Sequence, residues 1–306
     1  AALGNLLLFL LIAFAAFGVV LLAGTTLYLR SVVAVSSAST SRRRMGAEEL
    51  GRRTVSGSAM TTYLLKDLKI LVRTPIFFMN NVLMNFLWPF FLLLPLFGAS
   101  GDPDLESLMA ILKDGIFTGD MPFVPLALAI AFAFFLFVAG TNGIAETCIS
   151  REGRNVYIMK YIPMSYSRQV WSKVGAGVLL SVLGALVGVV FFVVVLAPPA
   201  WFVLLLLLLV PGAVLVPNTT GVLFDLYWPK VRWDNEQKAV KQNMNVLYGM
   251  AVSLLLAGGA IALVTSLSPG LFVTVLVLTL VPLGLSAAAA VIVTRLAPRL
   301  LRDLVP

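Results

Sequence analysis

Residues 201–223 read WFVLLLLLLVPGAVLVPNTTGVL and contain no charged side chain. A helix needs about 20 apolar residues to cross a hydrocarbon core, so this stretch predicts a membrane span. Of the 306 residues, 60% are apolar and 12% are charged, with a mean hydropathy of +0.99. We therefore predict an all-α, polytopic membrane helix bundle. Its other spans are predicted over 4–28, 77–97, 122–145, 172–197, 246–267 and 270–294.

The positive charges lie almost entirely on one set of connecting segments. Every Lys and Arg except Lys113 falls in 29–76, 146–173, 224–245 or the C-terminal tail 295–306. The positive-inside rule makes these segments cytoplasmic. It places the acidic segment 98–121 and the N-terminal end of the chain outside. The short bends after 197 and 267 further predict that each pair of flanking spans packs as antiparallel neighbours.

The residue inventory excludes several kinds of site. The chain has no histidine and one cysteine, Cys148, which excludes His-based catalysis and an intrachain disulfide. The interiors of the predicted spans from residue 77 onward lack Asp, Glu, Lys and Arg, which argues against a proton-coupled carrier. No Gly-x-x-x-x-Gly-Lys-Ser/Thr loop is present. We expect no catalytic site, no metal site, no bound cofactor and no nucleic-acid partner.

The segments outside the core spans differ in character. The span 4–28 is separated by a long segment from the spans that follow, and the family resemblance given below implies that it is left from an upstream half of a longer protein. Residues 29–58 are rich in Ser, Gly and Arg and predict a cytoplasmic linker. Residues 59–74 alternate leucines with basic residues at helical spacing, and Pro75 follows. This pattern predicts an amphipathic helix in the membrane interface; the alternative is the first turns of the next span.

Neutral polar side chains within the spans are the candidates for a translocation pathway. The candidate set is Asn81, Asn85, Trp88 and Asn142. The alternative, which we favour, is that the asparagines form hydrogen bonds between helices.

Two cytoplasmic segments carry most of the remaining information. Residues 146–173 read ETCISREGRNVYIMKYIPMSYSRQVWSK and combine charged with apolar side chains. Such a surface suits docking into a groove on a partner protein; the alternative is an interfacial helix on lipid. The candidate docking residues are Ser150, Arg151, Glu152, Gly153, Arg154, Lys160, Pro163 and Met164.

The second segment, 224–245, reads FDLYWPKVRWDNEQKAVKQNMN. An aromatic, proline-containing turn precedes a predicted helix that begins near Asp234 or Asn235. The family resemblance of this segment, described in the next paragraph, implies as candidate functional residues Asp225, Pro229, Trp233, Asn235, Glu236, Lys238, Lys241 and Asn243.

These two segments resemble one family. The run ISREGRN at 149–155, followed by Lys-x-x-Pro at 160–163, is similar to the segment after the second core span of ATP-binding-cassette (ABC) type-2 permeases. The run D-x-x-x-P-K-x-x-W-x-N-E-x-x-A-V-K-Q-N, from Asp225 to Asn243, resembles the loop before the last two spans in a large-permease branch of that family. The order of elements is also similar over 59–294.

The resemblance implies a six-span exporter domain over 59–294, with an elbow helix at 59–74 and a cytoplasmic coupling helix. It implies a separate cytoplasmic ATPase, in two copies, that binds ATP and Mg. The other expected partners are a second permease half or a second copy of the chain, and membrane lipids. It further implies that Trp233, Glu236 and Lys241 brace the second loop against the coupling segment or the ATPase, with Glu236 buried and paired.

The implied activity is export of a hydrophobic or amphipathic cargo, by analogy a peptide, across a bacterial inner membrane. The alternative, from another class, is a membrane scaffold or regulatory subunit that transports nothing.

Overall fold

The computed structural model describes residues 58–98, 103–118 and 123–304, together with a few helical positions between 4 and 21. The chain divides into two units, Ala1–Ser56 and Gly57–Pro306. The predicted linker 29–58 and most of the predicted span 4–28 lie outside the described residues. The helices described below belong to the second unit.

The described part of this unit is helical and contains no strand. Five of its helices are long and apolar enough to cross a membrane, and a sixth span results if the bent pair Ala59–Arg73 and Pro75–Phe91 counts as one. This confirms the prediction of a multi-pass helical bundle. The elements are α3 (Ala59–Arg73), α4 (Pro75–Phe77), the π-helix η1 (Phe78–Leu83), α5 (Met84–Gly98), α6 (Pro103–Thr118), α7 (Phe123–Thr141), the 3₁₀-helix η2 (Ser150–Lys160), α8 (Tyr166–Leu196), α9 (Ala200–Tyr227), α10 (Glu236–Val240), α11 (Met244–Leu267) and α12 (Leu271–Leu304).

A sharp bend separates α3 from the helix that follows it. Thr74 is extended, with φ −90° and ψ 111°, and Pro75 begins the next helix at an angle of 87°. Proline disfavours the helical conformation at the residue before it and lacks the N–H that a continuous helix needs. The predicted helix and its end at Pro75 are therefore confirmed, whereas its position in a membrane interface stays a prediction.

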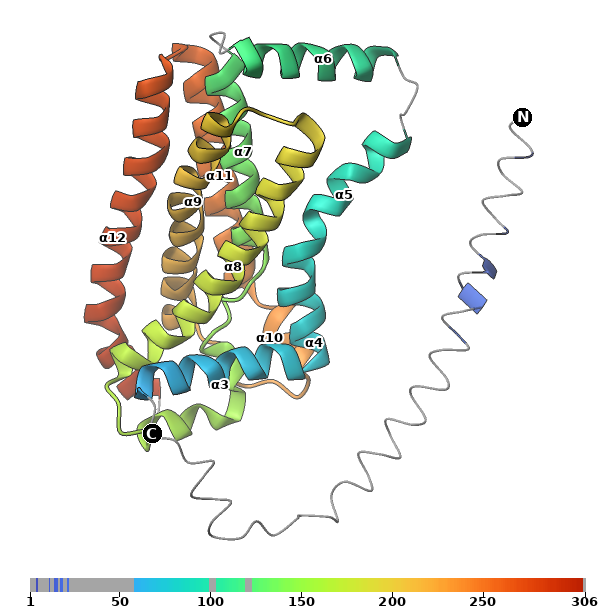
Figure 1. Ribbon diagram of the computed structural model, residues 1–306. Helices are drawn as coiled ribbons and strands as arrows, with labels where there is room; N and C mark the ends of the chain where they lie inside the picture. The colour runs from blue at the N-terminus through green and yellow to red at the C-terminus, as the bar shows by residue number, and fades with distance from the viewer. Residues whose placement is uncertain are drawn as a thin grey trace. The chain divides into compact units, whose positions relative to one another are not determined.

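The connecting elements lie at two opposite ends of the bundle (Figure 1). Helices α3 and α10 lie at one end, and α6 lies at the other. Helix α6 has two acidic residues, Asp104 and Glu106, in its first turn. The basic and acidic segments are thus separated as the charge distribution predicts. We refer to the end that carries α3, η2 and α10 as the basic end.

The core is built from aromatic and branched side chains of the central helices. Phe132 and Phe135 of α7 pack with Leu206 and Leu209 of α9 in one buried cluster. Helix α8 packs beside α9, as its short connection predicts.

The predicted pairing of the last two spans is wrong. Helix α12 packs chiefly against α9, and α11 packs chiefly against α7. A glycine permits each approach: Gly212 of α9 faces Pro282 of α12, and Gly140 of α7 faces Ser253 of α11. The predicted cytoplasmic tail 295–306 is helical as far as Leu304, because α12 continues there and buries Ala297 and Leu301 against α8 and α9.

Candidate functional site

Four charged side chains meet inside the basic end, and we call them the charge cluster: Asp67 of α3, Arg151 and Glu152 of η2, and Lys173 of α8. Asp67 Oδ2 lies 3.0 Å from Arg151 Nη2, and Asp67 Oδ1 lies 3.0 Å from Lys173 Nζ. Lys173 Nζ also lies 2.5 Å from Glu152 Oε1. The cluster therefore joins three elements that are far apart in the sequence.

The charges in this cluster are buried and mutually compensated. The side chains of Asp67, Arg151 and Lys173 are at most 1% exposed. Arg151 Nη1 also donates to the carbonyl of Ile144 at 2.5 Å and to Thr147 Oγ1 at 2.7 Å. An unpaired charge at such a depth is strongly destabilising, so the positions of these side chains depend on one another.

Glu152 forms the rim of the cluster. Burial opposes its ionisation, but the ammonium groups of Lys173 and Lys66 outweigh burial and hold the pKa of Glu152 below its usual range. Lys66 Nζ lies 2.7 Å from Glu152 Oε1, and the Lys66 side chain is 39% exposed. The outer ion pair is therefore much weaker than the inner ones, because solvent screens it.

Asp225, near the end of α9, anchors the start of η2. Its Oδ2 accepts hydrogen bonds from the backbone N–H of Ile149 at 2.6 Å and of Ser150 at 3.0 Å. Its Oδ1 accepts from Ser150 Oγ and, at 3.0 Å, from Asn245 Nδ2 of α11. One buried carboxylate thus ties η2 to both α9 and α11.

The second cytoplasmic segment, 224–245, also contacts the start of η2. Trp233 Nε1 donates to the carbonyl of Ser150 at 2.8 Å, and the backbone N–H of Lys230 donates to Ser150 Oγ at 2.8 Å. Gly153, at φ +56°, lies against the Trp233 ring. The two predicted functional segments are therefore in contact, as the bracing hypothesis requires.

The residues that make this contact differ from those expected. Glu236 and Lys241 are exposed, and no ion pair of either is found in the described ranges. Glu236 does not brace the loop against the coupling segment, because it lies in the first turn of the short helix α10, on its solvent side; a contact of Glu236 with the ATPase stays a prediction. Asp225 and Trp233 make the contact instead.

The other predicted residues of the second loop have local structural roles. Asn235 caps α10 by accepting from the backbone N–H of Gln237, and Asn243 caps α11 by accepting from that of Asn245. Lys238 pairs with Asp234 at the surface at 2.7 Å. Pro229 follows the end of α9 and is half-buried.

The predicted docking residues divide into two groups. Ser150, Arg151, Glu152 and Gly153 face inward and hold η2 in place through the contacts with Asp67, Lys173, Asp225 and Trp233. The others lie on the outer part of the segment. The carbonyl of Met164 accepts a hydrogen bond from Gln169 Nε2 at 2.9 Å. The exposed members of this outer group are Arg154, Lys160 and Pro163, together with the apolar side chains of Tyr157, Ile158 and Tyr161.

The asparagines proposed for a pathway are buried and hydrogen-bonded between helices. Asn81 Nδ2 donates to the carbonyl of Asn142 at 2.6 Å, and Asn85 Nδ2 donates to that of Leu180 at 2.7 Å. Asn142 Nδ2 donates to Ser181 Oγ at 2.8 Å. Trp88 packs edge-on against Phe137, with ring centroids 4.7 Å apart. This arrangement matches the favoured alternative and places none of the asparagines on an open pathway.

The sequence patterns did not identify Asp67 as a functional residue, and they marked Lys173 only as one of the basic residues of 146–173. A signal for Asp67 was present, since Tyr63, Asp67 and Leu71 recur every four residues and form the buried stripe of α3. Asp67 is also the one acidic residue in 59–74. No comparable local pattern marks Lys173.

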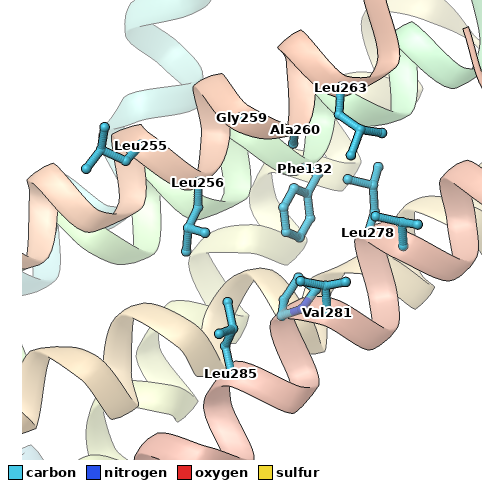
Figure 2. Close-up of a pocket in the computed structure, with 11 residues that line it drawn as sticks. Phe132, Leu255, Leu256, Gly259, Ala260, Leu263, Leu278, Val281 and Leu285 are labelled. Carbon is cyan, nitrogen blue, oxygen red and sulfur yellow. The ribbon is translucent and has the colours of Figure 1, made fainter. Parts of the chain in front are cut away.

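A separate hollow of about 180 Å³ lies between α11 and α12, against Phe132 of α7 (Figure 2). Its lining is apolar and includes Leu255, Leu278 and Leu285. Hydrocarbon suits such a lining, because no polar side chain is present there to orient a ligand.

Neither a metal-binding group among the described residues nor a similarity to known proteins points to a further function. No group of three or more metal-ligating side chains occurs in the described ranges. No protein-family model, curated protein or solved structure matches this chain.

Replacing Gly153 with alanine should destabilise the basic end by about 1–3 kcal/mol, since φ +56° is costly for a residue with a side chain. The added methyl group would also lie 2.5 Å from the Trp233 ring. Thermal unfolding in detergent, followed by circular dichroism, measures the effect. Gly258→Ala in α11 is the control, because its added methyl meets nothing within 4 Å and alanine favours a helix. Equal melting temperatures for the two variants would contradict this.

Proposed function

We propose that this chain is the membrane permease of an ATP-driven exporter of the ABC type-2 kind, with the ATPase on a separate cytoplasmic subunit. The observation that supports this proposal best concerns residues 150–164, which comprise η2 and the turn after it: one side of the segment is fixed to the bundle and the other side is exposed. The inner side of this segment is held by buried ionic contacts, and its outer side presents Tyr157, Ile158 and Tyr161 to solvent. An exposed apolar surface of this kind typically marks a protein or membrane interface, and the charged side chains of Arg154 and Lys160 beside it suit a protein partner.

The proposed coupling follows from which helices hold the segment. A displacement of η2 acts on α3 and α8 through the charge cluster and on α9 and α11 through Asp225. Because buried ion pairs tolerate little separation, these helices move with η2. Closure of two ATPase subunits would thereby rearrange the bundle, and a second permease half or a second copy would supply the other half of the assembly.

The ATPase is proposed to bind a basic hollow beside η2 as well. This hollow, of about 550 Å³, is lined by Arg154, Arg232, Trp233, Asp234 and Lys238. Lys238 is already paired with Asp234, so the two arginines carry its uncompensated charge. An acidic side chain of the ATPase complements them, and such complementarity sets the association rate and the choice of partner.

Reversing Arg154 and Arg232 to glutamate together should weaken association with the co-expressed ATPase at least about tenfold, because like charges across an interface repel. Both residues are exposed, so the melting temperature of the permease should not change. Arg151 is unsuitable for this test, since it is buried in the charge cluster. Affinity measurement at low and physiological salt gives the result, with the exposed Lys241→Glu as the control variant. Unchanged affinity in the double variant would exclude this docking surface.

The proposed cargo is hydrophobic or amphipathic, and a peptide by analogy with the family. Stimulation of ATP hydrolysis in reconstituted vesicles by an amphipathic peptide, and not by a hydrophilic peptide of equal length, is the expected result. If the ATPase binds but no cargo stimulates it, the scaffold function explains the chain better.

A further inference from the structure

Glu146 is a buried carboxyl group that the proposed mechanism does not use. It lies in the turn after α7, at the basic end, and is 1% exposed. Neither of its carboxyl oxygens has a hydrogen-bond partner of good geometry; the backbone N–H groups of Ala145 and of Glu146 itself lie near enough only to lower its pKa in part. A buried charge is normally paired or hydrogen-bonded, so this environment does not suit an ionised carboxylate.

The carboxyl group fills a slot between two helices, and glycines form both walls. A methyl group added at Gly221 of α9 would lie 2.7 Å from Glu146 Oε1. A methyl group added at Gly249 of α11 would lie 2.7 Å from Glu146 Cγ. Helices α9 and α11 therefore close tightly on this side chain and leave no room for solvent beside it.

The surrounding charges do not neutralise an ionised Glu146. The pKa of Glu146 is raised to about 8: burial and, to a smaller extent, Asp225 of α9 raise it, whereas the backbone N–H groups of Glu146 and Ala145 and the guanidinium of Arg151 of η2 lower it. Helices α7 and α11 contribute no charged side chain to the surroundings, and the thiol of Cys148 belongs to the same turn. Arg151 is already committed to Asp67 and to two other acceptors.

We infer that Glu146 is a proton-binding site, and that its proton is required for α9 and α11 to close around it at the basic end. Release of the proton to solvent leaves a carboxylate that needs water, and water reaches it only when the two helices separate. The inference goes beyond the proposed function, because it requires no ATPase and no cargo.

The direction of the pH effect follows from the two states. The ordinary pKa of the carboxyl is 4.5, and in the closed slot it is about 8. Between these values the closed state holds one proton more than the open, hydrated state. Rising pH therefore favours opening by about tenfold per unit over this window. The dependence ends near pH 8, where the closed state also loses the proton.

Cys148 provides a reporter of opening in the native chain. It is fully buried, two residues from Glu146, and the sequence contains no other cysteine. The experiment measures the rate at which a small thiol reagent modifies Cys148 in the purified full chain in lipid nanodiscs, from pH 6 to pH 8. Glu146→Gln keeps the shape of the side chain but binds no proton in this range. Dividing the wild-type rate by the variant rate at each pH removes the intrinsic pH dependence of the thiol.

This rate ratio is expected to rise more than about tenfold between pH 6 and pH 8. Glu236→Gln, which alters an exposed carboxyl at the same end, should behave as wild type. A ratio that stays constant with pH would show that another group, such as Asp225, carries any pH dependence, and would overturn the inference.

A second measurement does not depend on the folding of the glutamine variant. Infrared difference spectroscopy of the wild-type chain with isotope-labelled glutamate detects the carbonyl stretch of a protonated glutamic acid. We expect this band at pH 7 and its loss as the pH is raised above 8. Absence of the band at pH 7 would equally overturn the inference.

Discussion

Replacing Lys173 with methionine is expected to lower the free energy of unfolding by about 3–5 kcal/mol, the typical cost of removing one partner from a buried ion pair. Lys173 is fully buried and contacts both Asp67 and Glu152. Its loss leaves Asp67 with Arg151 as its remaining cation and leaves Glu152 with the partly exposed Lys66. Chemical unfolding of the purified chain in mixed micelles, followed by circular dichroism, measures the difference.

Lys66→Met is the matched control, since it removes an ammonium group that contacts the same Glu152 oxygen. Because the Lys66 side chain is 39% exposed, its loss should cost only about 0–1 kcal/mol. The double variant Lys173→Met with Asp67→Asn should cost less than the sum of the two single changes, because the two residues share one interaction. Equal effects of the two lysine changes would show that the cluster is hydrated and not a buried junction.

Replacing Asp225 with alanine is expected to cost about 3 kcal/mol or more, since removing one acceptor leaves buried donors unsatisfied at about 1–3 kcal/mol each. The donors are the backbone N–H groups of Ile149 and Ser150, the Ser150 hydroxyl and the Asn245 amide. Hydrogen exchange offers a local readout, because the two backbone amides should exchange much faster in the variant.

Asp234→Ala is the control for Asp225. Asp234 lies in the same loop region but is exposed and pairs with Lys238 on the surface, so its loss should change neither unfolding nor exchange at Ile149 and Ser150. Unchanged exchange at these two amides in Asp225→Ala would mean that η2 is held in place without this carboxylate.

Local sequence patterns predicted the helices and the bend between α3 and α4. Apolar runs of span length predict helices that can cross a membrane, because a helix satisfies its own backbone hydrogen bonds without water. Pro75 predicts the end of α3 for an equally local reason. The separation of basic from acidic segments was also predicted, since it depends on the order of charges along the chain.

Part of the candidate site was predicted and part was not. Motif spacing pointed to Ser150, Arg151, Asp225 and Trp233, which the structure brings together. It also pointed to Glu236, which is exposed. A charged residue in a loop has the same appearance in the sequence whether it is solvated or buried, and only the packing around it distinguishes the two.

The sequence by itself therefore determined that the protein is a multi-pass helical bundle, how far most of its helices extend, and that basic and acidic segments lie at opposite ends. These features depend on residues close together in the chain. Only the tertiary structure decided which charges are buried and which helices pack together beyond the pair α8 and α9. Lys173 meets Asp67 across 106 residues, Glu146 fits between two glycines from α9 and α11, and α12 packs on α9 in preference to α11. Each of these outcomes depends on shape complementarity between distant segments, and no local pattern of hydropathy or charge encodes it.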